Sequence, residues 1–315
     1  MSIVEKALRK FQADRQTLRT QRSEGQHLPP VVGQVVERAE PPVSPPRAAE
    51  HPIPIARPQK VVHIDRDLLR RAGLLPPESQ EHELADQYRV IKRPLIQHAF
   101  ERHSQASNAG PPQLIMMASA LPGDGKTFTC INLSLSMSLE KDYSVLLVDA
   151  DVAKPHISRV FGVENEPGLL DVVTDPSLPI ESVILPTDVP RLQIIPAGRR
   201  SETATELLAS RRHREIVNRL AELNPRGLVL FDSPPILLTS EARTLAGLVG
   251  QIVVVVRAGV TPQQALKDTI AILGPDRHIS LVLNQAEIGG PMSYYYGGSR
   301  YGYAHPPADD SNAAR

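Results

Sequence analysis

Residues 114–127 have the sequence LIMMASALPGDGKT, an apolar run followed by a glycine-containing loop that ends in Lys126 and Thr127. Glycines at such positions let backbone N–H groups surround phosphate oxygens. The lysine of such a loop reaches the β- and γ-phosphates, and the hydroxyl after it ligates Mg²⁺. The stretch therefore predicts a phosphate-binding loop between a buried strand and a helix.

The loop departs from the usual pattern at one position, because Ala120 stands where the first glycine is expected. The segment after it, residues 131–139, alternates apolar and small polar residues, which is also typical of a strand. Because it directly follows a phosphate loop, we predict a helix there. The predicted nucleotide contacts in this region are Pro122, Gly123, Asp124, Gly125, Lys126, Thr127 and Phe128.

Working outward, short aliphatic runs recur along the chain and predict the fold class. They are continuously apolar, as strands buried on both faces are, so we expect a mainly parallel sheet with helices on both faces. This is the α/β P-loop NTPase fold. The predicted strands are residues 113–119, 144–149, 192–196, 227–232, 251–257 and 279–284, and the predicted helices beyond the loop include 203–223, 240–248 and 261–273.

Acidic residues mark the ends of two predicted strands. Asp149 and Asp151 follow the run at 144–149, and Asp232 ends the run at 227–232. In open α/β sheets, nucleotides and Mg²⁺ bind at the carboxyl ends of parallel strands. Carboxylates are hard ligands that suit Mg²⁺. These three side chains are therefore candidates for the same site as the phosphate loop.

The composition excludes several classes of protein. Lys plus Arg and Asp plus Glu both number 35, so there is no basic excess to indicate nucleic-acid binding. One cysteine excludes an internal disulfide framework and a cysteine-rich zinc site. No apolar run approaches the roughly 18 residues needed to cross a bilayer, and the N-terminus lacks a signal-peptide core. We expect a cytoplasmic protein.

The chain divides into four predicted regions. Residues 1–28 have apolar residues at helical spacing, with six basic and three acidic residues, and are predicted to form an amphipathic docking helix. A linker at 29–60 holds nine prolines. The P-loop domain covers 61–290, and 291–315 forms a flexible tail.

Tyrosines are concentrated in that tail. Five of the chain's seven lie within ten residues, at Tyr294, Tyr295, Tyr296, Tyr301 and Tyr303. A cluster of this kind in a glycine-rich segment predicts phosphoacceptor sites. Each phosphate adds a charge of about −1.5 to −2, and such charges would repel one another and an acidic site. Phosphorylation could thereby be coupled to dissociation of an oligomer.

Three stretches resemble the Walker A, A′ and B motifs of bacterial tyrosine kinases. They are, in that order, Lys126-Thr127, the stretch from Asp149 to Lys154, and the strand end at Asp232. The chain is most similar to the subgroup in exosortase-linked exopolysaccharide clusters. The resemblance implies ATP and Mg²⁺ as cofactors. It also implies autophosphorylation in trans within a ring-shaped homo-oligomer, which regulates exopolysaccharide synthesis, export and chain length.

The same resemblance implies roles for further residues and partners. Asp86, Arg89 and Lys92 resemble an oligomerisation motif, Lys154 stands at a position tied to subunit contacts, and Asn284 lies where related folds recognise adenine. The implied partner is an inner-membrane polysaccharide co-polymerase, a Wzz-like activator, which would recruit the chain to the inner face of the cytoplasmic membrane. Membrane contact would then be indirect.

We assign provisional roles at the site. Lys126 would hold the phosphates, while Thr127, Asp151 and Asp232 would organise Mg²⁺. Asp149 would orient or deprotonate the tyrosine hydroxyl. Of these assignments, the division of roles between Asp149 and Asp151 has the least support in the sequence. Such an inventory suffices for phosphoryl transfer, which needs mainly positioning and charge stabilisation.

Two alternatives remain open from the sequence. The first is a partitioning or positioning ATPase of the deviant-Walker type, whose signature lysine is replaced here by Leu121. The second is a non-catalytic nucleotide-binding scaffold of a polysaccharide export complex, which the missing glycine at Ala120 favours. The ATPase alternative leaves the tyrosine cluster unexplained, whereas the scaffold would present the tail to a membrane partner.

Overall fold

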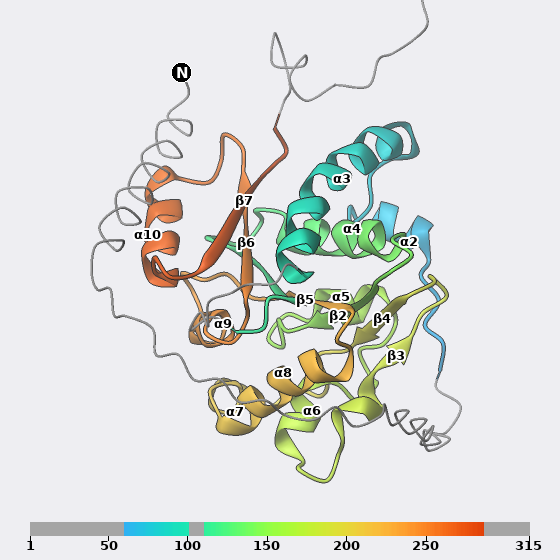
Figure 1. Cartoon of the computed structure of the whole chain (residues 1–315), viewed down its shortest axis with the longest axis vertical. Coiled ribbons are helices and arrows are strands. Elements are labelled where there is room, and N and C mark those ends of the chain that lie inside the picture. Colours follow the sequence, from blue (N-terminus) through green and yellow to red (C-terminus); the bar gives the residue numbers. More distant parts are fainter. Residues whose placement is uncertain (1–59, 101–109, 287–315) are drawn as a thin grey trace, which may run out of the picture. The chain divides into compact units, whose positions relative to one another are not determined.

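The computed structural model describes residues 60–100 and 110–286 (Figure 1). The amphipathic segment at 1–28, nearly all of the linker at 29–60 and the tail at 291–315 lie outside the described residues, so their predicted organisation stays a prediction. Within the described part, no helix is both long enough and apolar enough to cross a membrane.

The described residues form one seven-stranded sheet in the order β3-β4-β2-β5-β1-β6-β7. All neighbouring strands are parallel except β3 and β4. The strands are β1 Leu114–Ser119, β2 Ser144–Asp149, β3 Leu185–Pro186, β4 Leu192–Ile195, β5 Gly227–Asp232, β6 Gln251–Arg257 and β7 His278–Asn284. The prediction of a mainly parallel α/β sheet is confirmed.

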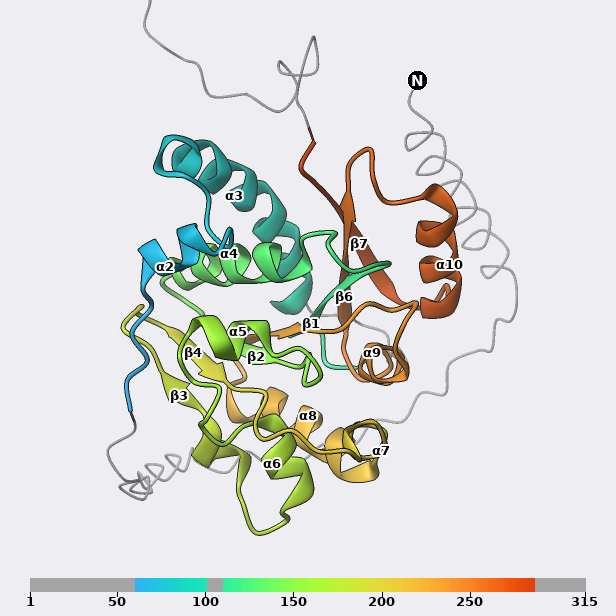
Figure 2. The ribbon, with the colours of Figure 1, turned by 180° about the vertical axis from the view of Figure 1, so that it is seen from behind.

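Helices cover both faces of the sheet, as the continuous apolar strands predicted (Figures 1 and 2). The α-helices are α2 Arg66–Arg71, α3 Glu78–Phe100, α4 Lys126–Ser138, α5 His156–Val160, α6 Leu169–Thr174, α7 Ala204–Leu208, α8 Arg211–Leu223, α9 Ser240–Ala246 and α10 Gln263–Leu273, with a 3₁₀ helix at Ile180–Val183. Buried residues of α2, α3, α4 and α5 pack on one face, and those of α6 to α10 pack on the other.

Strand β1 shows how the two faces share one central strand. Leu114, Met116 and Ala118 belong to the core on the α6–α10 face, whereas Ile115 and Met117 belong to the core on the α3–α4 face. Every residue of β1 is buried. A strand that is buried on both sides has no polar face, which is why its sequence is continuously apolar.

Six predicted strands agree with the structure to within one residue at each end. The helix after the phosphate loop, α4, is also confirmed against the strand-like alternation of its sequence. Strand β3 was not predicted, because two residues paired antiparallel at the sheet edge are too few to show a periodic pattern.

The predicted single helix at 203–223 was wrong, since the structure has two helices there. Helix α7 ends at Leu208, and α8 starts at Arg211 after an extended Ser210 with ψ of 162°. The Ser210 hydroxyl accepts a hydrogen bond from the backbone N–H of His213 at 3.2 Å. Serine is favoured as the N-cap of a helix and is less favourable in a helix interior, so Ser210 starts α8 and does not extend α7.

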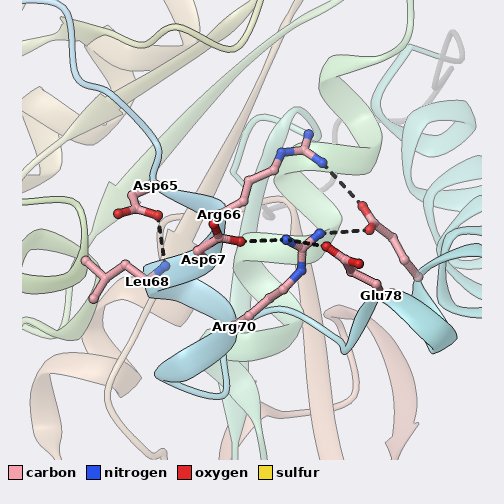
Figure 3. A network of polar contacts seen from close by, with 7 residues as sticks. Asp65, Arg66, Asp67, Leu68, Arg70 and Glu78 are labelled. Carbon is pink, nitrogen blue, oxygen red and sulfur yellow. Dashed lines mark hydrogen bonds and ion pairs between the residues drawn. The ribbon is translucent and has the colours of Figure 1, made fainter.

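An ion-pair network joins α2 to the start of α3 (Figure 3). Arg70 on α2 contacts Asp67 at 3.0 Å, Glu78 at 3.5 Å and Glu81 at 3.0 Å. Asp65 caps α2 by accepting the N–H of Leu68 at 2.9 Å. Helix α3 in turn packs on α4, the helix that follows the phosphate loop. The network therefore fixes how α2 and α3 meet beside the loop.

We expect Ser210→Ala to lower the free energy of unfolding by about 1 kcal/mol, because α8 would lose its cap. Chemical denaturation with an unchanged slope would measure this loss. Ser210→Asp is the matched control, since a carboxylate oxygen can accept the same N–H bond and should retain stability. Equal destabilisation by both variants would contradict a capping role.

Candidate functional site

The phosphate loop leaves the carboxyl end of β1 and enters α4. Gly123 and Gly125 adopt left-handed φ angles of 85° and 93°. Gly125 is the N-cap residue of α4, it receives no side-chain cap, and the first turn of α4 carries no acidic residue. Backbone N–H groups at this helix start are thus available to an anion, and the helix dipole favours negative charge there.

Residues from two distant segments hold the loop in place. The Asp124 carboxylate accepts bonds from the Leu121 N–H at 3.1 Å and the Thr261 hydroxyl at 2.7 Å. The Asn284 side chain, at the end of β7, donates to the Asp124 carbonyl at 3.0 Å. A Cβ added to Gly125 would lie 1.9 Å from the Asn284 amide nitrogen, so the Asn284 side chain would have to move, and the φ of 93° also favours glycine there.

Thr261 was not predicted as part of the site. A buried carboxylate such as that of Asp124 needs hydrogen-bond donors, but nothing in the sequence indicates that Thr261 supplies one. Asn284 was predicted to contact adenine. The structure places its amide on the loop backbone, and the adenine contact stays a prediction.

Strand β5 lies next to β1, and it brings Asp232 to the start of α4. One Asp232 oxygen lies 3.0 Å from the Lys126 ammonium, and the other accepts the Thr127 hydroxyl at 2.8 Å. Burial acts to lower the pKa of Lys126, but the charge and hydrogen bond of Asp232, together with the charge of Asp151, outweigh it, and the net shift is upward. Lys126 is therefore charged, buried and paired.

Asp149 lies directly opposite Asp232 on the adjacent strands β2 and β5. Its side chain is fully buried. One oxygen, Oδ2, accepts the Ser158 N–H at 2.8 Å and the Ser158 hydroxyl at 2.7 Å. The other oxygen, Oδ1, is buried without a hydrogen-bond partner. Burial, aided by the charges of Asp232 and Asp151, raises the pKa of Asp149 to about 7.

Asp151 is half-buried and differs from Asp149 in its surroundings. Its Oδ1 accepts the backbone N–H of Lys154 at 3.1 Å. Burial also raises the pKa of Asp151, although the Lys126 charge acts in the opposite direction. The Lys154 side chain itself is exposed. The structure thus brings Lys126, Thr127, Asp149, Asp151 and Asp232 to one edge of the sheet, as the strand ends predicted.

The residues present fit a magnesium nucleotide. In the described ranges no three side chains of His, Cys, Asp or Glu converge as an all-protein metal site. Magnesium in nucleotide sites instead takes one or two carboxylates together with phosphate oxygens and water. Asp232, Asp151 and the Thr127 hydroxyl supply that donor set, and the uncapped start of α4 supplies donors for phosphate.

The three residues of the predicted oligomerisation motif do not lie together on the surface. Asp86 and Arg89 form an exposed pair at 2.6 Å. Lys92 is buried, and its ammonium contacts the Ser136 carbonyl and Glu140, each at 2.7 Å. In this chain Lys92 joins α3 to the end of α4. The interface roles of Asp86, Arg89, Lys92 and Lys154 stay predictions. The five candidate phosphoacceptor tyrosines lie outside the described residues.

Comparison with known proteins supports the family indicated by the motifs. Residues 112–270 match a family model described as an AAA domain. The tyrosine-protein kinase YwqD of Bacillus subtilis is 27% identical over 218 residues, which are 69% of this chain and 87% of YwqD. The putative tyrosine-protein kinase EpsB of Ralstonia nicotianae is 32% identical over 192 residues, which are 60% of this chain but 25% of EpsB.

Solved structures show the same fold. The kinase domain of the Escherichia coli tyrosine kinase ETK superposes with a TM-score of 0.55 at 24% identity, over 65% of this chain and 78% of that domain. The VpsO kinase domain superposes with a TM-score of 0.54 at 24% identity, over 67% of this chain and all of that domain. The relatives are bacterial tyrosine-protein kinases, as the motifs predicted, while membership of the exosortase-linked subgroup stays a prediction.

We expect the nucleotide-free protein to lose stability relative to Asp149→Asn as the pH rises from about 4 to 7. The folded pKa of Asp149, about 7, lies above the ordinary aspartate value of 3.8. Between these values the folded state holds a proton that the unfolded state has released, so stability falls with rising pH. The difference in free energy of unfolding between the wild type and Asp149→Asn should change by up to about 4 kcal/mol over this pH range.

Thermal or chemical unfolding in EDTA across this pH range would measure the difference. The exposed Asp142→Asn is the matched control and should keep the wild-type pH dependence. If Asp149→Asn followed the wild type at every pH, the buried carboxyl would not be the cause.

Proposed function

Since the chain belongs to the AAA domain family, we propose that it is an ATP-dependent protein-tyrosine kinase that phosphorylates its own tyrosine cluster. The observation that carries the proposal is the pairing of Lys126 and Thr127 with Asp232, beside the partly unpaired carboxylate of Asp149. This arrangement combines phosphate binding, cation binding and an acceptor for a hydroxyl proton in one place.

Lys126 and the N–H groups at the start of α4 would bind and neutralise the phosphates. Asp232, Asp151 and Thr127 would hold Mg²⁺, which when bound neutralises the charge that develops on the phosphates. Lys126 and Thr127 both contact Asp232 in the nucleotide-free protein. Nucleotide binding would therefore exchange these contacts for contacts with phosphate and metal.

Asp149 is the group suited to the acceptor hydroxyl. The tyrosine oxygen would bond to the γ-phosphorus of ATP while the bond to the β–γ bridging oxygen breaks, and ADP leaves. The hydroxyl proton would pass to Asp149, whose pKa of about 7 matches proton transfer near neutral pH. A buried carboxyl with such a raised pKa does not stabilise the folded protein at neutral pH, so stability alone does not explain its presence.

Strand β7, which precedes the acceptor segment in the sequence, ends at the phosphate loop. Asn284 ends β7 and donates to the loop backbone, and Tyr294 follows ten residues later in the sequence. We propose transfer in trans within a ring-shaped homo-oligomer, with Asp86 and Arg89 at the interface. The proposed role is regulation of exopolysaccharide synthesis, export and chain length.

The alternatives predict different products. A partitioning or positioning ATPase would release phosphate without phosphotyrosine. Leu121, at the position of the signature lysine, offers only an apolar side chain, and its N–H is used to hold Asp124. A scaffold would bind nucleotide without turnover of either kind.

We expect incubation with MgATP to place phosphate on tyrosines between Tyr294 and Tyr303, mapped by mass spectrometry. Lys126→Ala should lower the rate by about 100-fold or more, because the phosphates lose their buried cation. The exposed Lys267→Ala, on α10, is the matched control and should behave as wild type. A tail without phosphate despite ATP binding would contradict the kinase proposal, and ATP turnover would then decide between the alternatives.

We also propose that residues 1–28 recruit the chain to an inner-membrane polysaccharide co-polymerase. Deleting them should abolish co-purification with that membrane partner and leave ATP affinity unchanged, because the nucleotide site lies wholly within residues 110–286. Pull-down and nucleotide titration on the same preparation would measure both effects. Undiminished recruitment would contradict the docking role.

A further inference from the structure

Ser158 connects three elements at the edge of the sheet that carries the nucleotide site. It lies in α5 and is fully buried. Its hydroxyl and its backbone N–H both donate to the same oxygen of Asp149, Oδ2, at 2.7 and 2.8 Å. The hydroxyl oxygen also accepts the backbone N–H of Ala197, just after β4, at 2.9 Å. Ser158 therefore ties the ends of β2 and β4 together.

The contact with Ala197 determines which way the Ser158 hydroxyl donates. A serine hydroxyl has one proton and two lone pairs, and its proton normally rotates to suit the surroundings. Here the Ala197 N–H occupies a lone pair, and the only remaining partner given by the structure is Asp149. The proton is thus directed at the carboxylate.

Two donors on Oδ2 leave Asp149 with a defined free oxygen. Oδ1 is buried and has no hydrogen-bond partner among the described residues. A buried acceptor without a partner costs free energy, so its presence in a folded protein indicates a role in function. The two bonds from Ser158 also favour this orientation of the carboxylate, with its second oxygen unpaired.

We propose that Ser158 is a positioning residue that holds Asp149 so that Oδ1 receives the proton of the attacking hydroxyl. This inference rests on the proposed function for the identity of that hydroxyl, a tyrosine. Ser158 itself touches neither phosphate nor acceptor. It acts through Asp149, and its effect should therefore disappear when Asp149 can no longer accept a proton.

Four variants test this: Ser158→Ala, Ser158→Thr, Asp149→Asn and the double variant Ser158→Ala/Asp149→Asn. Ser134→Ala is the matched control, since Ser134 is equally buried but bonds only the Cys130 carbonyl within α4. Each protein is assayed for thermal unfolding, ATP affinity, ATP turnover and phosphotyrosine formation.

We expect Ser158→Ala to lower kcat by about 10- to 100-fold, because a positioned base is worth at least that much. ATP affinity should stay within about twofold of wild type, since the hydrogen bonds of Ser158 go to Asp149 and Ala197 and not to the phosphate loop. Ser158→Thr keeps the hydroxyl and should recover most of the rate. In the Asp149→Asn background, Ser158→Ala should have no further effect on kcat.

Multiplicative effects of the two substitutions would overturn the proposal, as would a loss of ATP affinity equal to the loss of rate. If Ser158→Thr unfolds, the double variant still decides the outcome. ATP turnover without phosphotyrosine would refute tyrosine as the acceptor but not the positioning role of Ser158. The coupling of Ser158 to Asp149 would then be measured from the rates of ATP hydrolysis by the same variants. A wild-type chain with neither activity would refute both.

Discussion

The buried pair of Lys126 and Asp232 is the interaction on which the nucleotide site depends. Removing two charges from water costs free energy that their attraction only partly offsets, so such pairs seldom exist for stability alone. Here the ammonium and the carboxylate belong to neighbouring elements, α4 and β5, and the Thr127 hydroxyl bonds the same carboxylate. The pair keeps both groups charged and ready for a ligand that separates them.

Around this pair, negative charge exceeds positive charge. Asp149 and Asp151 add two more carboxyl groups, and the charge of Asp232 acts on both of them. One ammonium cannot balance three carboxylates, so the site favours a further cation when all are ionised. Burial is the main cause of the raised pKa of Asp149, and the neighbouring charges of Asp232 and Asp151 add to it.

The sequence predicted most of the sheet, and the reason is local. Strands such as β1 and β5 are buried on both faces, so their apolar runs are unbroken and their ends are marked by Asp232 or by the phosphate loop. The placement of Asp149 and Asp232 at the same edge of the sheet followed from parallel strands, whereas their position opposite each other is shown by the structure. These features required no knowledge of which side chains meet across the fold.

Contacts between distant segments could not be predicted in this way. Ser210 broke a helical pattern that its neighbours continued, and only its bond to the His213 N–H shows it to be a cap. Lys92 matched a surface motif but is buried against α4. Thr261 lies 137 positions from Asp124, and nothing local to either residue indicates their bond. That bond and the Asn284 amide hold the loop before any ligand arrives, so little binding free energy is needed to order it.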